Sequence, residues 1–203
     1  MKGHDVVLRS FAKPLATQHT DIRRVLAMIV AHASQQNARV QQCFNESGWA
    51  TVIVPMLLAE KDPSALAALL HACSCLCREC DSASKLFITS GGIVALEEIL
   101  RSTNAERVTP KILQRVLFFV EYLAQAGISS EALITATATH LSSSSSDVSV
   151  AAASTINAVG AKDISVVKTL VKPLLNQGFL SSITEADASD PRVVLKRSLS
   201  DEN

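Results

Sequence analysis

Cysteine is the residue type in this chain whose spacing could bind a metal. Four of the five cysteines are Cys73, Cys75, Cys77 and Cys80, and on a helix the first, third and fourth of these share one face. A structural zinc site usually has two short-spaced ligand pairs separated by a loop, and the sequence contains no second pair of this kind. We therefore interpret the cysteines as small apolar residues at a helix interface and predict no bound metal, with a zinc-stabilised domain as the alternative.

Motifs that would indicate enzyme chemistry are missing from the sequence. It contains no phosphate-binding GxxxxGK or GxGxxG segment, no HExxH metal motif and no GxSxG nucleophile motif. Its serines and histidines do not form a recognisable catalytic pair. We therefore expect no enzymatic activity and no cofactor.

The composition of the 203 residues favours an all-α protein. Hydrophobic residues make up 48% of the chain and aromatic residues only 4%, which suits helices packed by aliphatic and small side chains. Nineteen basic residues balance 19 acidic ones, so no whole-chain positive field would attract nucleic acid or an anionic membrane. The longest apolar stretch, near residues 65–77, is shorter than the roughly 20 residues of a membrane span. We expect a cytoplasmic protein that binds neither nucleic acid nor membrane.

An internal repeat organises the chain. Residues 85–101, KLFITSGGIVALEEILR, contain a short amphipathic run, a paired-glycine turn and a second amphipathic run, and a weaker copy lies at residues 40–58. At a spacing of 43 residues, the two copies align Phe44 with Phe87, Gly48 with Gly91, Ile53 with Leu96, and Leu57 with Leu100. A period of about 40–47 residues is typical of helical repeats that stack into a solenoid.

A longer helix is predicted beside each copy. Apolar side chains recur at helical spacing in residues 20–36, 62–79 and 109–125. Thr20 has the residue type of a helix cap, and Asp62 and Thr109 are each followed at once by a proline, Pro63 or Pro110, which suits the N-cap and the first helical position. These last two start signals are 47 residues apart, so the third helices repeat with nearly the same period.

The quoted segments resemble the armadillo repeat. They are NARVQQCFNESGW, DSASKLFITSGGIVALEEIL and VLFFVEYLA, in which a short helix, a glycine turn and a second helix precede a longer third helix. The resemblance implies an all-α fold, a short right-handed armadillo/HEAT-like superhelical solenoid of stacked three-helix repeats. In that fold the third helices line a concave groove.

We predict a single armadillo-like domain over residues 1–183. Its parts are repeats at roughly residues 20–80 and 81–127, a degenerate repeat at 128–163 and a terminal cap at 164–183. The degenerate repeat has room for one helix before the serine run at 142–146, and Asp147 is the predicted cap of the next helix. The last residues, 184–203, lack periodicity and are predicted to be a disordered tail.

Two ladders of groove residues follow when the third helices are aligned through the glycine turns. They are Met28, His71 and Phe118, and His32, Cys75 and Tyr122. In many armadillo proteins these rows are Trp and Asn residues that hold an extended peptide, and neither row has that pairing here. The resemblance therefore favours a groove shaped for a folded partner. Charged residues near the rows are Arg23, Arg24, Arg78, Glu79, Lys111, Arg115 and Glu121.

Nine residues of this concave face are predicted to bind a protein partner. They are Arg23, Arg24, Met28, His32, His71, Arg78, Arg115, Phe118 and Tyr122. For His71 and Phe118 the alternative is packing at a helix–helix seam. For the charged residues the alternative is an ordinary solvated helix face.

Within the armadillo proteins, one subfamily is the most similar. The segments LRSFAKPLATQHTDIRRVLAMIVAHASQQNARVQQCFNESGW and ALLHACSCLCRECDSASKLFITSGGIVALEEIL are similar to the armadillo-type nucleotide-exchange factors of the seventy-kilodalton heat-shock chaperones. The similarity covers roughly residues 8–125 and includes the IR opening, the QQN junction followed by VQQ, and the SCLCRE helix end.

That resemblance implies a co-chaperone with no nucleotide site of its own. Its concave face would bind the ATPase domain of a cytosolic seventy-kilodalton heat-shock chaperone and promote ADP release. The alternative is an armadillo-type scaffold with a different protein partner and no exchange activity. In both cases we expect a monomer.

Overall fold

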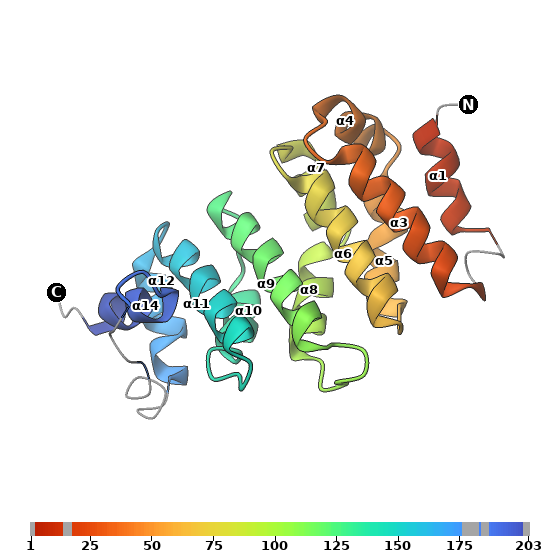
Figure 1. The fold of residues 1–203 in the computed structure, drawn as a ribbon. Helices are drawn as coiled ribbons and strands as arrows, with labels where there is room; N and C mark the ends of the chain where they lie inside the picture. Colours follow the sequence, from red (N-terminus) through yellow and green to blue (C-terminus); the bar gives the residue numbers. More distant parts are fainter. Residues whose placement is uncertain (1–2, 14–17, 176–182, 184–186, 201–203) are drawn as a thin grey trace. The chain divides into compact units, whose positions relative to one another are not determined.

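All secondary structure in the described part of the chain is helical (Figure 1). The computed structural model describes residues 3–13, 18–175, 183 and 187–200. The chain divides into two compact units, Met1–Arg115 and Val116–Asn203, and the division falls inside helix α9 (Pro110–Gln125). This division does not test the predicted single domain over residues 1–183, which stays a prediction.

The first unit follows the predicted order of two shorter helices and a longer third helix. Helix α1 (Gly3–Phe11) precedes the predicted repeats, and α3 (Thr20–Ser34) lies at the start of the first of them. The repeats themselves contain α4 (Ala38–Glu46), α5 (Trp49–Ala59) and α6 (Pro63–Cys77), then α7 (Asp81–Thr89), α8 (Gly92–Arg101) and the start of α9.

The glycine turns have the conformation that the repeat predicts. Gly48 has φ 68° and Gly91 has φ 85°, in the left-handed region that glycine adopts without a Cβ penalty. Phe44 and Phe87, aligned by the 43-residue spacing, are both buried. Gly92, which follows the second turn, lies against Phe87, and a Cβ atom there would overlap the phenyl ring. The predicted repeat is thus present in both backbone and core.

Two of the three helix caps predicted in the first unit are confirmed. The Asp62 carboxylate accepts a hydrogen bond from the Ala65 backbone N–H at 2.8 Å, ahead of Pro63 at the start of α6. The Thr109 hydroxyl accepts one from the Ile112 N–H at 3.4 Å. The prediction for Thr20 is wrong, because His19 is the N-cap of α3 and Thr20 is its first helical residue.

The core of the first unit is built from the apolar faces that the periodicity indicates. Helices α3 and α6 lie side by side (Figure 1). Trp49 stacks on Phe87 with ring centroids 6.2 Å apart. Cys73 and Cys77 are fully buried, in agreement with their interpretation as packing residues, whereas Cys80 is only half-buried at the N-cap of α7. All five cysteines are free.

The second unit contains the remainder of α9 and the shortened repeat. Its further elements are α10 (Glu131–Ala138), α11 (Ser146–Gly160), α12 (Ile164–Leu170), the 3₁₀ helix η1 (Lys172–Leu174) and α14 (Pro191–Ser200). One helix precedes the serine run, as predicted. The predicted cap of α11 is wrong, because its N-cap is Ser145 and Asp147 lies in the first turn.

The predicted disordered tail is wrong for residues 191–200, which form α14. Val193, Leu195 and Leu199 of this helix are buried, and the Asn157 amide of α11 donates a hydrogen bond to the Pro191 carbonyl at 2.8 Å. A short apolar face with a packing partner is therefore enough to order this segment. The parts of the predicted tail at 184–186 and 201–203 lie outside the described residues, as do residues 176–182 of the predicted cap.

Candidate functional site

The nine predicted partner-binding residues separate into distinct groups. Those of the first unit come from α3 (Arg23, Arg24, Met28 and His32), α6 (His71), the position after α6 (Arg78) and the start of α9 (Arg115). Phe118 and Tyr122 lie further along α9, in the second unit. Four of the nine line one pocket of the first unit: Arg24, Met28, His71 and Arg115.

This pocket, which we call the basic pocket, has a volume of about 570 Å³. Ligand pockets in proteins typically measure about 300–1,000 Å³. Its lining residues come from α3, α6 and the segment that begins α9, and they are Arg24, Met28, Pro63, Ser64, Ala67, Ala68, His71, Thr109, Lys111, Ile112 and Arg115. Three elements therefore converge on a single cavity.

Charge distinguishes the basic pocket. Arg24, Lys111 and Arg115 supply three cationic side chains, and of the described residues that line the pocket none is acidic. The N-terminus of α9 at Pro110 adds to this potential, because the N-terminal end of a helix carries a partial positive charge, whereas the Asp62 carboxylate caps the N-terminus of α6 and offsets it. The pocket is thus suited to a negatively charged group.

His71 forms part of the pocket wall and favours its neutral form. Burial lowers the pKa of His71, and electrostatic interaction with the Arg115, His32 and Arg78 side chains lowers it further. The His71 and His32 rings meet edge to face, with centroids 6.5 Å apart. Cys75 Sγ lies 3.7 Å from Nδ1 of the His71 ring. The imidazole is thus a polar, uncharged wall near neutral pH.

Arg23 does not line the basic pocket, although it precedes Arg24 directly. Its side chain is 16% exposed, and its Nε and Nη2 atoms donate to Glu60 Oε2 at 2.6 Å and Oε1 at 3.0 Å. Nη2 also donates to the Thr20 hydroxyl at 3.0 Å. The structure therefore gives Arg23 an internal role, in which it ties α3 to the end of α5.

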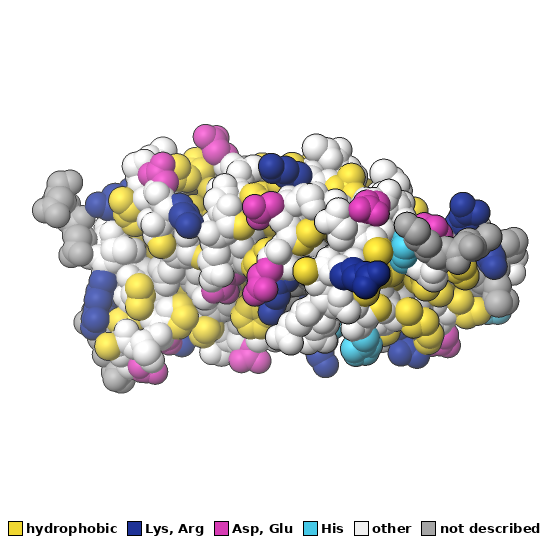
Figure 2. Space-filling model, turned by 90° about the horizontal axis from the view of Figure 1, so that it is seen from above, with side chains coloured by type: hydrophobic (Ala, Val, Ile, Leu, Met, Phe, Trp, Pro, Cys, Tyr) yellow, Lys and Arg dark blue, Asp and Glu magenta, His cyan; other side chains and the backbone are white. Residues whose placement is uncertain are grey.

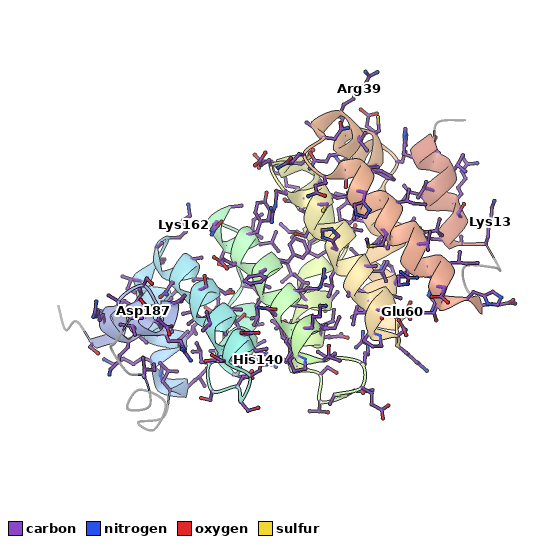
Figure 3. The ribbon with its side chains drawn as sticks, in the orientation of Figure 1. Lys13, Arg39, Glu60, His140, Lys162 and Asp187 are labelled. Carbon is purple, nitrogen blue, oxygen red and sulfur yellow. The ribbon has the colours of Figure 1, made fainter. Side chains whose placement is uncertain are left out.

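Glu60 holds this junction together from the C-cap of α5. Its carboxylate is 2% exposed, and Oε1 also accepts the backbone N–H groups of Lys61 at 3.0 Å and Asp62 at 3.1 Å. Burial raises the pKa of Glu60, but the hydrogen bonds from Arg23 and the Asp62 backbone outweigh it, so the pKa lies below its ordinary value. Figure 3 labels Glu60 in this junction.

Arg107 fastens the segment before α9 to the same junction. Its Nε donates to the Glu60 carbonyl at 2.7 Å and its Nη2 to the Leu57 carbonyl at 2.7 Å. A cation here satisfies carbonyls at the C-terminal end of α5, where the helix dipole is negative. The helix that carries Arg24 and the segment that leads to Lys111 are therefore anchored on one helix end.

Glu60, Arg107 and Lys111 are the site-supporting residues that sequence reasoning left out of its predicted set. A signal for Glu60 existed, because a carboxylate at a helix C-terminus is unfavourable unless a cation pairs with it. Lys111 precedes Arg115 by four residues and so shares its helix face. Arg107 has no comparable sequence signal, because its partners are backbone carbonyls distant in the chain.

The remaining predicted residues lie outside the pocket. Phe118 is 52% exposed, so packing in the core does not account for it. Tyr122 is half-buried, and His32 and Arg78 are exposed. Arg78 also lines a small cavity of about 90 Å³ next to His71 and Cys75.

Neither a metal-binding cluster nor a membrane-spanning helix is present among the described residues. No group of three or more His, Cys, Asp or Glu residues in that part of the chain could hold a metal ion. Likewise, none of the described helices has the length and apolar character needed to cross a bilayer.

Solved structures define the class of this fold. An engineered protein superposes with a TM-score of 0.74 at 17% identity, over 98% of this chain and 78% of that chain. A designed armadillo repeat protein in complex with the peptide (KR)4 gives a TM-score of 0.74 at 11% identity, over 96% of this chain and 79% of that chain. A computationally designed armadillo repeat protein for modular peptide recognition gives 0.69 at 13% identity, over 97% and 79%. The predicted all-α armadillo class is confirmed.

The family follows from the sequence itself. Residues 5–140 match the profile of the SIL1/FES1/HPBP1 C-terminal domain, so the chain belongs to this family. The family comprises nucleotide-exchange factors of the seventy-kilodalton heat-shock chaperones, and the resemblance noted in the sequence is confirmed. No curated protein sequence matches the chain.

Proposed function

We propose that this protein is a nucleotide-exchange co-chaperone that binds the ATPase domain of a cytosolic seventy-kilodalton heat-shock chaperone and promotes ADP release. The observation that carries the proposal is the family match over residues 5–140, which includes every residue of the basic pocket. The basic pocket is the part of the first unit that the ATPase domain contacts, through Arg24, Met28, His71, Lys111 and Arg115.

Exchange requires no chemistry from the co-chaperone. It requires tighter binding to the nucleotide-free conformation of the ATPase domain than to the ADP-bound one, because a ligand shifts an equilibrium only by its differential affinity. A thousandfold faster ADP release corresponds to about 4 kcal/mol of barrier reduction. A rigid contact surface can supply this energy, and the Arg23–Glu60 pair and Arg107 stiffen two of the elements that line the pocket.

The remaining features of the proposal concern the working form of the protein. It acts as a monomer in the cytoplasm, without a cofactor and without catalysis of its own. Four of the five cysteines lie close together between residues 73 and 80, unlike the dispersed cysteines of a secreted disulfide scaffold, which supports a reducing compartment. Phe118 and Tyr122 add partner contacts from the second unit.

Release of labelled ADP from the chaperone ATPase domain, followed by stopped flow, tests the proposal. Saturating protein should accelerate release. Binding without acceleration would favour the scaffold alternative, and absence of both binding and acceleration would refute the proposal. Light scattering of the purified protein tests the monomer.

A further inference from the structure

Positive charge gathers in the basic pocket although the chain as a whole is neutral. The 19 basic and 19 acidic residues balance. Figure 2 shows basic and acidic side chains interspersed on the face in view, with apolar side chains between them. The three cationic side chains around this cavity are therefore a local feature and do not reflect a generally basic surface.

The cations on α9 lack a carboxylate partner within the described part of the chain. Lys111 and Arg115 lie one helical turn apart on the same face, and the ion pairs of the described residues do not include either of them. Arg24 pairs with Asp21 at 3.5 Å, but the Asp21 side chain is 89% exposed, so solvent weakens that pair. Carboxylates of this chain therefore compete little with a ligand for the cations of the pocket.

The carboxylate at the start of α6 does not line the pocket. Asp62 caps the helix by accepting the Ala65 N–H at 2.8 Å, and it is not among the lining residues. The remaining wall is apolar, with Ile112 at 2% and Ala68 at 5% exposure, beside the half-buried Met28. A ligand that fits both features carries a carboxylate on or next to an aliphatic side chain.

We propose that the basic pocket binds an acidic segment of the partner protein, in which Glu or Asp carboxylates stand beside an aliphatic side chain. The inference rests on the proposed function for the identity of that partner, the chaperone ATPase domain, and adds the chemistry by which it docks. Lys111 and Arg115 pair with the carboxylates, and arginine can do so through two parallel hydrogen bonds. Met28 and Ile112 contact the aliphatic part.

Charge-reversal variants test this docking directly. Binding of the ATPase domain would be measured by calorimetry for wild type, Lys111→Glu and Arg115→Glu, with Arg39→Glu as the matched control. Arg39 is exposed on α4 and does not line the basic pocket, and Figure 3 shows it pointing away from the helices. We expect each pocket variant to weaken binding by about tenfold or more and the control to change it by less than about twofold.

Unfolding would not explain the expected loss for Lys111→Glu. The residue is exposed in the first turn of α9, where a negative charge favours the helix dipole. Circular dichroism of both variants should match wild type. The salt dependence of binding should also become shallower in the variants, because an ion pair has been removed.

An acidic peptide provides a second arm that does not need the chaperone. A synthetic helical peptide of Glu and Leu should bind wild type and lose binding in Arg115→Glu, whereas the same peptide with Lys in place of Glu should not bind. Fluorescence anisotropy of the labelled peptides measures both.

The outcomes separate the inference from the proposed function. If wild type accelerates ADP release but Lys111→Glu and Arg115→Glu bind the ATPase domain as tightly as wild type, the inference is overturned and the proposed function stands. If wild type neither binds nor accelerates, the proposed function falls and the peptide arm decides. If wild type then binds the acidic peptide and Arg115→Glu does not, the inferred binding of carboxylates in the basic pocket is supported. If wild type does not bind the acidic peptide, or binds the Lys peptide, the inference is overturned.

Discussion

Arg23 and Glu60 form a two-point ion pair between α3 and the end of α5, with contacts of 2.6 Å and 3.0 Å. The pair lies next to Arg24, the residue of α3 that supplies charge to the basic pocket. Arg107 joins the same junction through the Glu60 carbonyl. The end of α5 therefore anchors both α3 and the segment before α9, which line the pocket. The contribution of this junction to the free energy of unfolding can be measured separately from partner binding.

Removal of the Glu60 carboxylate should destabilise the protein. Glu60→Ala leaves Arg23, only 16% exposed, without its partner, and loss of one member of a buried pair usually costs several kcal/mol. Because Arg23 keeps some solvent contact, we expect a loss of about 2–3 kcal/mol in the free energy of unfolding. Urea denaturation measures it, with the exposed Glu98→Ala as the control. A loss no larger than that of the control would contradict the role assigned to Glu60.

The same carboxylate should make stability depend on pH in the acidic range. The pKa of Glu60 is lower in the folded protein than its ordinary value of 4.5. Its contribution is therefore fully present above about pH 4.5, where the unfolded carboxyl is ionised, and is lost as the pH falls through the folded pKa. The difference in unfolding free energy between wild type and Glu60→Gln should shrink from pH 7 to pH 3. A constant difference over that range would show that the Glu60 charge does not contribute.

The pKa of His71 reports the electrostatic interaction between its imidazole and Arg115 in the basic pocket. Burial is the largest cause that lowers the His71 pKa, and the Arg115 charge is the next. Arg115→Gln should therefore raise the His71 pKa, while Arg39→Gln, remote from the pocket, should leave it unchanged. An NMR pH titration of the His71 imidazole measures both variants. Equal pKa values in wild type and Arg115→Gln would mean that the two side chains do not interact in solution.

Close packing at the second glycine turn gives a further prediction. A Cβ atom on Gly92 would overlap the Phe87 ring, and overpacking of a core typically costs about 1–3 kcal/mol. Thermal denaturation of Gly92→Ala should show a loss in this range, and Phe87→Leu should lessen the additional effect of the alanine. Gly3→Ala is the control, since nothing lies within 4 Å of its Cβ position.

The cap of α14 should control the order of the C-terminal helix. The Asp190 carboxylate accepts the Arg192 backbone N–H at 2.8 Å and pairs with the Arg192 side chain at 2.6 Å. Loss of such a cap usually costs about 1 kcal/mol. Asp190→Ala should speed amide hydrogen exchange in residues 191–200 and leave α10 unchanged. Unaltered exchange in residues 191–200 would contradict this role of Asp190.

Local signals in the sequence were sufficient for the repeat. Asp62 with Pro63 and Thr109 with Pro110 mark true helix starts, because a capping side chain and a residue without an N–H both suit that position. Asp190 with Pro191 is the same signal, and it begins α14. The prediction of disorder for residues 184–203 rested on their lack of periodicity, although Val193, Leu195 and Leu199 are buried and α14 packs against α11.

The site was predictable only in part, because it depends on which helix face points where. Arg24 and Met28 are four residues apart and share a face, whereas Arg23 is turned by about 100° and cannot line the same surface. Spacing could therefore have separated the two arginines. Spacing could not have shown that Glu60 forms an ion pair with Arg23. Nor could it have shown that Lys111 and Arg115 line one pocket with residues of α3 and α6, because tertiary packing sets those contacts.

The most direct test of the account is the rate of ADP release from the ATPase domain of a cytosolic seventy-kilodalton heat-shock chaperone, measured with wild type and Arg115→Glu side by side. We expect wild type to accelerate release and Arg115→Glu to need about tenfold more protein for the same rate. Release that stays at the spontaneous rate with saturating wild-type protein would contradict it.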